Sequence, residues 1–302
     1  MSVSFFIKRL AIIGVGLIGG SLAQSLREQD LVGEIVGMAR SANTLETALQ
    51  MKVIDRATHS LTEAVEGATL VVVATPVCSI VPSVQQFVPF LSKGAVVTDV
   101  GSVKGNIVHA CDALMPEGIH FVGGHPIAGR ERAGVAASFA SLFQGSRTIL
   151  TPSPTTHLPS MELVRLVWES TGSKVETMEP AHHDQVLAAT SHLPHLMAYS
   201  LVNTLSDLEE DLRSEVFRYA AGGFRDFTRI ASSDPTMWRD ICLENKNAII
   251  GIIDRYIATA NHLKEFIGRS DAEAMFDFFS RSKTTRDRVL AENKNLRGDA
   301  QR

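Results

Sequence analysis

The chain has 302 residues, enough for two domains and too few for three of ordinary size. Its formal net charge at pH 7 is −4, so it lacks the basic excess that nucleic-acid binding requires. Hydrophobic residues make up 45% and charged residues 21%, which is normal for a globular protein with a core. The three scattered cysteines are too few for a disulfide framework and favour a reducing, cytoplasmic location.

The N-terminal region has the charge pattern of a secretory signal, because Lys8 and Arg9 precede an uncharged stretch from Leu10 to Leu26. Four glycines interrupt this stretch and no A-x-A cleavage pattern follows. Glycine is also a poor helix former. We therefore expect a glycine turn here rather than a signal peptide. No other stretch approaches the ~20 apolar residues needed to cross a bilayer, so we expect no membrane association.

Short apolar runs alternate with helical patterns through the first half of the chain. The helical patterns cover residues 17–27, 43–51 and 104–114. Strands are expected at residues 10–13, 35–38, 70–74, 95–100, 121–122, 148–150 and 174–178. The run LVVVA at residues 70–74 is typical of a strand buried on both faces. The alternation predicts an α/β fold, with a doubly wound, mostly parallel, Rossmann-like sheet.

After about residue 179 the pattern changes to long helices, expected at residues 183–205, 208–219, 237–264 and 272–293. The change predicts two domains, an α/β domain over residues 1–179 and an all-helical domain over residues 180–302. A helical stretch as long as 240–264 is typical of helices that pair between subunits, so we expect the second domain to mediate dimerisation.

The sequence GVGLIG at residues 14–19 is a G-x-G-x-x-G motif between the first strand and the first helix. The first glycine allows the tight turn, the second lets a pyrophosphate approach the backbone, and the third allows close helix–strand packing. The helix N-terminus offers N–H groups and a partial positive charge to phosphates. The motif predicts a dinucleotide site formed by Gly14, Gly16, Leu17, Ile18 and Gly19. The alternative is an empty glycine turn in an unrelated α/β protein.

The end of the second strand predicts which dinucleotide binds. About 20 residues after the last glycine, an Asp or Glu would bind the ribose 2′-hydroxyl of NAD. Ala39 stands there instead, followed by Arg40 and Ser41. Because an arginine can pair with a 2′-phosphate and stack on adenine, we expect NADP, with NAD as the second choice. The alternative is that Arg40 is only a solvent-facing loop residue.

Ligands of open α/β sheets lie beyond the carboxyl ends of the strands, where three further segments of this chain fall. We expect Thr75 and Pro76, after the third strand, to contact the cofactor. DVGSVK at residues 99–104 follows the fourth strand, and GGHPIAG at residues 123–129 follows the fifth. A lone histidine is more often structural. The position of His125 at a glycine-rich strand end favours an acid–base role.

Five ordered motifs together resemble the prephenate/arogenate dehydrogenases of tyrosine biosynthesis, over about residues 10–257. They are GVGLIGGS, DVGSVK, GGHPIAGRERAG, HLPH (residues 192–195) and GGFRDFTRIASSDPTMW (residues 222–238). The resemblance implies NADP- or NAD-linked oxidative decarboxylation of prephenate, arogenate or both, yielding 4-hydroxyphenylpyruvate or tyrosine. Many family members carry an acid at the position of Ala39, so this chain departs from them where the cofactor is chosen.

The resemblance also implies site residues. His125 matches the catalytic histidine that hydrogen-bonds the C4 hydroxyl of the substrate, and Ser102 matches the serine that orients it. His195, Arg229 and Glu131 match substrate-side residues, with Arg229 pairing with a carboxylate and Asp226 placed to hold its guanidinium. Gly222 and Trp238 match residues lent by a neighbouring subunit, which implies a homodimer with shared sites.

Other interpretations of these residues stay open. Arg229 and Asp226 could form only a surface ion pair, and Trp238 could be plain helix core. The histidines at 182, 183, 192 and 195 could suggest a metal, but no recognised ligand pattern accompanies them, so we expect none. A β-hydroxyacid or 6-phosphogluconate-type dehydrogenase is the second candidate enzyme, although these typically use a lysine of the helical domain. The non-enzyme alternative is an NADP-sensing scaffold.

Overall fold

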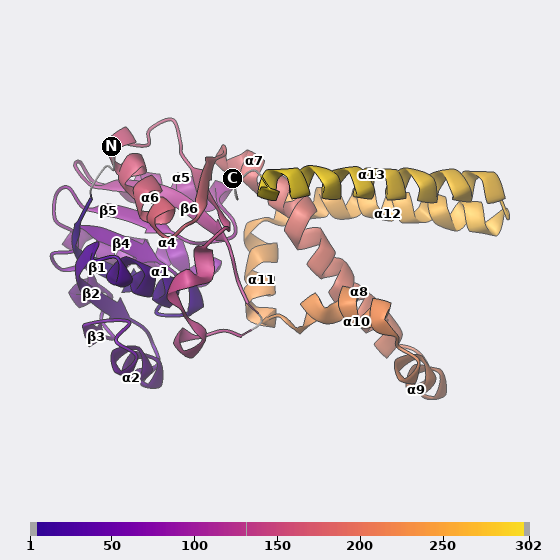
Figure 1. Ribbon diagram of the computed structural model, residues 1–302, viewed down its shortest axis with the longest axis horizontal. Coiled ribbons are helices and arrows are strands. Elements are labelled where there is room, and N and C mark those ends of the chain that lie inside the picture. Colours follow the sequence, from indigo (N-terminus) through magenta and orange to yellow (C-terminus); the bar gives the residue numbers. More distant parts are fainter. Residues whose placement is uncertain (1–4, 131, 299–302) are drawn as a thin grey trace. The chain divides into compact units, whose positions relative to one another are not determined.

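The β-branched runs of the first half form one eight-stranded sheet, in the order β3-β2-β1-β4-β5-β6-β7-β8 (Figure 1). The computed structural model describes residues 5–130 and 132–298. The strands are β1 (Ile7–Ile13), β2 (Val32–Met38), β3 (Arg56–Thr58), β4 (Leu70–Val73), β5 (Val96–Asp99), β6 (His120–Ile127), β7 (Arg147–Thr151) and β8 (Lys174–Thr177). All four residues of β4 are buried, as its apolar run predicts.

The strand order reverses at β1, which has β2 on one side and β4 on the other, both parallel to it. Right-handed crossovers then place the helices after β1 and after β4 on opposite faces of the sheet. The helices of the sheet region are α1 (Leu17–Glu28), α2 (Ala42–Gln50), α3 (Leu61–Val65), α4 (Val77–Phe87), α5 (Gly105–Leu114) and α6 (Leu158–Ser170). The predicted Rossmann-like class is confirmed, and the reversal opens a crevice at the carboxyl ends of β1 and β4.

The last two strands depart from the parallel pattern. β7 pairs with β6 in antiparallel orientation, with His125 opposite Ile149, and β8 runs parallel to β7. Among its described residues, the segment between β6 and β7 forms two short 3₁₀ turns, Val135–Ala137 and Ala140–Phe143, and no α-helix. A parallel pair is usually joined by a crossover that contains an α-helix, whereas the described residues of this segment form none, and the chain returns in the opposite direction.

The core of the first unit lies between the sheet and its helices. Trp168 of α6 is fully buried, and its ring meets Phe143 edge to face with centroids 5.1 Å apart. Leu22 and Leu26 of α1 are also fully buried and pack with strand residues such as Leu10 and Ile12. Leu22 and Leu26 lie four residues apart, on one face of their helix, so the amphipathic pattern that predicts α1 also provides its packing surface.

The helical half contains more breaks than its sequence pattern predicts. The expected helix at 183–205 comprises α7 (Pro180–Leu187), a π-helical segment (Ala188–His192) and α8 (Leu193–Ser206). Pro194 follows the π segment, and a proline cannot donate an intrahelical hydrogen bond. The remaining elements are α9 (Glu210–Arg218), α10 (Gly222–Thr228), a 3₁₀ turn (Arg229–Ser232), α11 (Pro235–Glu244), α12 (Lys246–Gly268) and α13 (Ala272–Gly298).

The chain divides into two compact units, residues 1–249 and residues 250–302. Helices α7–α11 therefore belong to the same unit as the sheet, and the expected boundary near residue 180 stays a prediction. The second unit contains most of α12 and all of α13, two long consecutive helices (Figure 1).

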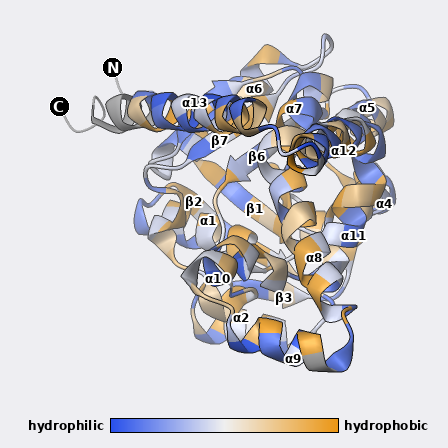
Figure 2. Ribbon diagram, turned by 90° about the vertical axis from the view of Figure 1, so that its right-hand side faces the viewer, coloured by the Kyte–Doolittle hydropathy of each residue, from blue (hydrophilic) through white to orange (hydrophobic). Residues whose placement is uncertain are grey.

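The helices of the second unit contain hydrophobic residues interspersed with hydrophilic ones (Figure 2), and several of the large hydrophobic side chains are exposed. The exposed ones are Ile250, Tyr256, Ile257, Ile267, Phe276, Phe279, Val289 and Leu290. Apolar surface of this extent is typical of an interaction site. Among the described residues, no helix is both long and apolar enough to span a membrane.

Candidate active site

The glycine turn after β1 has the geometry of a dinucleotide site. Gly14 has a φ of 98°, and a Cβ there would lie 2.6 Å from the carbonyl oxygen of Ala74. A Cβ on Gly19 would lie 2.7 Å from the carbonyl oxygen of Gly14, so α1 approaches β1 too closely for a side chain. A Cβ on Gly16, in contrast, would meet nothing within 4 Å. Each glycine therefore shows the property that the motif predicts, with open space where a pyrophosphate would approach.

The N-terminus of α1 is also suited to bind a phosphate. Gly16 is its N-cap and provides no side-chain hydrogen bond, and the first turn contains no acidic residue. The N–H groups at Leu17 and Ile18 thus lie at a helix end that favours an anion. The described residues fit the pyrophosphate of a nicotinamide dinucleotide.

The end of β4 completes this side of the crevice. The amide of Ala74 donates to the carbonyl of Ile13 at 2.7 Å, which joins β4 to the glycine turn. The hydroxyl oxygen of Thr75 is buried and has no hydrogen-bond partner among the described residues. Pro76 is exposed and precedes α4. An unpaired buried hydroxyl is costly, so a ligand group that pairs with Thr75 would be stabilised here.

The end of β2 presents a cation where NAD-binding chains present an acid. Ala39 is buried, and its carbonyl lies 2.8 Å from Nδ1 of His59. Arg40 and Ser41 are exposed. The hydroxyl of Ser41 accepts from the amide of Thr44 at 3.3 Å and caps α2, whose first turn has no acidic residue. A guanidinium and a helix N-terminus at this position are groups that can bind a phosphate.

A buried ion pair joins the ends of β5 and β6. The ammonium of Lys104 contacts the carboxylate of Asp99, and both side chains have 0% exposure. Lys104 also donates to the carbonyl of Gly124 at 3.0 Å. Asp99 accepts from the amides of Gly101 at 2.8 Å and Gly124 at 3.2 Å. These bonds satisfy both charges and fix the backbone immediately before His125.

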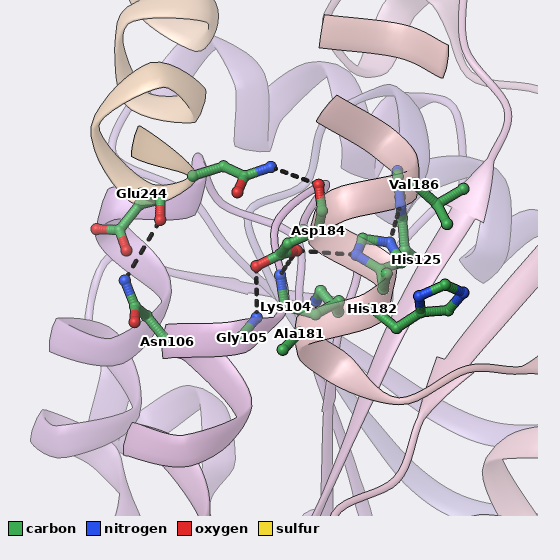
Figure 3. A network of polar contacts seen from close by, with 12 residues as sticks. Lys104, Gly105, Asn106, His125, Ala181, His182, Asp184, Val186 and Glu244 are labelled. Atoms are coloured by element: carbon green, nitrogen blue, oxygen red, sulfur yellow. Dashed lines mark hydrogen bonds and ion pairs between the residues drawn. The ribbon is translucent and has the colours of Figure 1, made fainter. Parts of the chain in front are cut away.

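The imidazole of His125 lies in a chain of hydrogen-bonded groups (Figure 3). Its Nδ1 is 2.9 Å from Nε2 of His183, and Nδ1 of His183 is 2.9 Å from Oδ1 of Asp184. Oδ1 of Asp184 accepts from the amide of Lys104 and Oδ2 from that of Gly105, each at 2.8 Å. From the sequence, His183 was considered only as a metal ligand, and Asp184 has no signal beyond its adjacency to His183 on a helix.

The environment of His125 keeps its ring neutral. Burial lowers the pKa of His125 well below its ordinary value, and His183, Lys104 and His192 lower it further. An imidazole that stays neutral at pH 7 can accept a proton. Nε2 has no partner among the described residues, and it is the atom left for a substrate.

Ser102 lies half-buried between β5 and α5. Within the described part of the chain no hydrogen bond joins it to His125, whose Nδ1 contacts His183 instead. The expected orienting role of Ser102 stays a prediction.

A second cluster of aromatic side chains surrounds His195. Its ring stacks on the indole of Trp238, with centroids 4.1 Å apart, and its Nδ1 lies 2.9 Å from the carbonyl oxygen of Ser191. Trp238 is buried, and its indole N–H has no partner in the described residues. Trp238 thus reaches His195 within one chain, and its predicted contribution to a neighbouring subunit stays a prediction.

His192 is a further buried histidine that the sequence analysis did not select. Its Nδ1 lies 3.2 Å from the side-chain nitrogen of Asn245, Nδ2, which also donates to the backbone carbonyl of Asp184 at 2.9 Å. Burial lowers the pKa of His192 to about 4. The neutral ring therefore accepts from Asn245 at Nδ1 and carries its proton on Nε2, which has no partner among residues 5–130 and 132–298.

The remaining predicted substrate residues lie on α10 and the 3₁₀ turn after it. Gly222, Asp226 and Arg229 are exposed. The turn that begins at Arg229 packs against α8, the helix that carries His195. Glu131 lies outside the described residues. No group of three His, Cys, Asp or Glu side chains within the described ranges could hold a metal ion.

Two protein-family models match consecutive parts of the chain. The nucleotide-binding domain of prephenate dehydrogenase matches residues 22–177, and its dimerization domain matches residues 179–281. The chain belongs to the prephenate dehydrogenase family. It is an oxidoreductase, as predicted, and this membership gives no support to a β-hydroxyacid dehydrogenase.

Individual relatives agree with the family models. The chain is 37% identical to the prephenate dehydrogenase of Bacillus subtilis, over 94% of this chain and 77% of that protein. It is 36% identical to the cyclohexadienyl dehydrogenase of Zymomonas mobilis, over 92% and 95%. A crystal structure of Aquifex aeolicus prephenate dehydrogenase with hydroxyphenyl propionate and NAD+ superposes with a TM-score of 0.88 at 38% identity, over 96% and 100%.

Proposed function

We propose that the chain catalyses the NADP-linked oxidative decarboxylation of prephenate, arogenate or both, to 4-hydroxyphenylpyruvate or tyrosine. The observation that carries the proposal is the neutral, buried imidazole of His125, hydrogen-bonded at Nδ1 and unpartnered at Nε2. The names of the relatives support the substrate class. They include prephenate dehydrogenases, a cyclohexadienyl dehydrogenase and an arogenate dehydrogenase of Synechocystis, the last at 29% identity and a TM-score of 0.79.

The reaction requires no covalent bond between the substrate and the protein. A bound nicotinamide would supply the acceptor for the hydride that C4 of the cyclohexadienyl ring loses. Nε2 of His125 takes the proton of the C4 hydroxyl as the carbonyl forms, and the C1 carboxylate leaves as carbon dioxide. Its electron pair enters the ring, which becomes aromatic and supplies the driving force. The protein therefore has to orient the ring, accept one proton and bind two carboxylates.

Cationic and donor groups of the helical part suit the carboxylates. Arg229 provides a planar fork that matches a carboxylate and stays charged at all relevant pH values. His195 stacks on Trp238, and we expect it to contact the side-chain end of the substrate. We expect Asp226 to position Arg229, and Glu131 to act in the loop after His125.

The preference for NADP rests on the end of β2. Arg40 and Ser41 are exposed there, and no acid stands in place of Ala39 to repel a 2′-phosphate. The guanidinium can pair with the phosphate and stack on adenine. NAD would lose this ion pair, so we expect it to be the weaker cofactor.

The active form is proposed to be a homodimer. The dimerization-domain match and the exposed apolar side chains of α12 and α13 support association of two chains. Gly222 and Trp238 are the residues that we expect each subunit to lend to the other's site. Sedimentation should give a dimer, and a stable, active monomer would contradict this arrangement.

The test of the function is a matrix of assays on purified protein. Prephenate and arogenate are each combined with NADP and NAD, and reduced nicotinamide is followed by its absorbance. We expect turnover of at least one substrate, with the higher kcat/KM for NADP. Absence of turnover with all four combinations would overturn the proposed activity and favour an NADP-binding protein without catalysis.

A further inference from the structure

We propose that His183 and Asp184 are positioning residues for the reaction. They form a one-directional hydrogen-bond chain that holds His125 in the tautomer whose Nε2 is a base. The inference rests on the proposed function, and it adds two residues of α7 that neither the motifs nor the family resemblance assigned. Figure 3 labels Asp184 and His125, the two ends of this chain, and His183 bonds to both of them.

The direction of the chain is set at Asp184, which is surrounded by donors. Its Oδ1 accepts from the amide of Lys104 and faces Nδ1 of His183, and its Oδ2 accepts from the amide of Gly105. Gly105 begins α5, so the carboxylate lies at a helix N-terminus, which stabilises a negative charge. A Cβ on Gly105 would lie 2.9 Å from Oδ2, so this approach suits a glycine. An ionised carboxylate can only accept, and Asp184 is therefore the fixed end of the chain.

The proton positions of both histidines follow from that fixed end. Nδ1 of His183 must carry hydrogen to donate to Asp184, and a ring with a single proton then keeps its lone pair on Nε2. Nδ1 of His125 must then carry hydrogen to donate to that lone pair across 2.9 Å. The remaining nitrogen of His125, Nε2, keeps its lone pair. The opposite tautomer of His125 would place two lone pairs against each other.

The hydrogen-bond chain also stabilises the positive charge that His125 acquires during the reaction, as the charges around it indicate. Lys104 faces it from the end of β5, but its charge is paired with Asp99. His192 faces it from the π segment and is neutral because burial lowers its pKa to about 4. Asp184 is thus the anion available to compensate an imidazolium. When the O–H bond of the substrate breaks and an N–H bond forms at Nε2, the positive charge is stabilised through His183. When the electron pair from the leaving carbon dioxide enters the ring, the C4 oxygen becomes a phenolate and takes the proton back from Nε2, which gives the 4-hydroxyl group of the product and restores the neutral His125.

The experiment compares Asp184→Asn and His183→Gln with the wild type. An asparagine can donate to His183 and invert its tautomer, which would place the hydrogen of His125 on Nε2. The matched controls carry the same substitutions on α5, outside the proposed hydrogen-bond chain. Asp112→Asn is the control for Asp184→Asn, and His109→Gln, at an exposed position, is the control for His183→Gln. Initial rates give kcat and KM for the substrate over pH 5–10. Nitrogen-15 NMR of labelled histidines reports which ring nitrogen of His125 carries hydrogen.

We expect kcat to fall by about 10²- to 10⁴-fold in Asp184→Asn, the range for loss of a general base. KM for substrate and the Kd of NADP should stay within about threefold, because no bound group is removed. The wild-type NMR spectrum should show His125 protonated at Nδ1 and Asp184→Asn should show it protonated at Nε2. His183→Gln should lower kcat similarly, and the controls should match the wild type.

Two outcomes would overturn the inference. One is a kcat within threefold of wild type in both variants with the fold intact by circular dichroism. The other is a wild-type His125 protonated at Nε2. The NMR readout needs no turnover, so it decides the tautomer even if the assay matrix shows no activity. If Asp184→Asn does not fold, His183→Gln carries the kinetic test.

Discussion

Lys104 and Asp99 form an ion pair in which neither side chain is exposed to solvent. The pair lies between β5 and α5, and its second partners are the carbonyl and the amide of Gly124. Asp99 also accepts the amide of Gly101. The pair therefore connects the loop that contains Ser102 to the strand that contains His125.

Removing one member of this pair should destabilise the protein strongly. In Lys104→Met the carboxylate of Asp99 stays buried without its counter-ion, which costs about 3–5 kcal/mol of unfolding free energy. Urea unfolding measures this loss. The double variant Lys104→Met/Asp99→Asn should recover part of it, since no buried charge remains. Arg147→Ala, which breaks the exposed pair with Glu176, is the control and should cost about 1 kcal/mol or less. A similarly small loss in Lys104→Met would contradict the argument.

Replacing the proposed base should impair catalysis and spare binding. We expect His125→Asn to lower kcat by about 10²- to 10⁴-fold, because no group then accepts the C4 hydroxyl proton. KM for the substrate should change little, since the carboxylates are bound elsewhere. Steady-state kinetics with saturating cofactor provides the measurement, and an unchanged kcat would remove the assigned role.

Removing the predicted carboxylate partner should have the opposite pattern. Arg229→Ala should raise KM for the substrate far more than KM for NADP, because the guanidinium is expected to contact only the substrate. Arg229→Lys keeps the charge but loses the bidentate fork, so its KM for the substrate should lie between those of the wild type and Arg229→Ala. Equal effects on both KM values would count against a carboxylate contact.

The cofactor prediction depends on one side chain at the end of β2. Arg40→Asp should lower kcat/KM for NADP and spare or raise kcat/KM for NAD, since an acid repels the 2′-phosphate and can bind the 2′-hydroxyl. The ratio of the two values is the measured quantity. A wild-type preference for NAD that Arg40→Asp leaves unchanged would end this hypothesis.

The buried His192 should make stability depend on pH. Its folded pKa of about 4 lies below the unfolded value near 6.5, so the unfolded chain binds more protons between these pH values. The unfolding free energy should therefore fall as the pH drops from 6.5 to 4, by on the order of 3 kcal/mol from this residue.

Urea unfolding at pH 7 and pH 4.5 tests the assignment. His192→Gln should lose less stability than wild type between the two conditions, whereas His109→Gln, at an exposed position, should follow the wild type. An identical pH dependence in His192→Gln would show that another group is responsible.

The features that short motifs encode could be predicted from the sequence. The glycine turn, the buried β4 and the position of His125 each follow from residues adjacent in the chain. β3 (Arg56–Thr58) was missed because its three residues form no apolar run. The break between α11 and α12 was missed because Asn245 is compatible with a helix. Its side chain instead bonds Asp184 and His192, far away in the sequence.

The candidate site shows the same division. Nothing adjacent to His125 in the sequence indicates that His183, 58 positions later, is its hydrogen-bond partner. Ser102 was expected in that role because it resembles a family residue. Contacts of this kind depend on how α7 packs beside β6, and helix periodicity carries no information about them.

The antiparallel pairing of β6 with β7 determines how firmly the proposed base is held. Beyond Val122, where its pairing with β5 ends, β6 continues through His125 with β7 as its neighbour. The proposed base therefore lies in a ladder of backbone hydrogen bonds rather than on a loop. The backbone amide hydrogens of this part of β6 should exchange with deuterium slowly. No lid has to close to bring this imidazole into place, so the proton acceptor is preorganised before the substrate arrives.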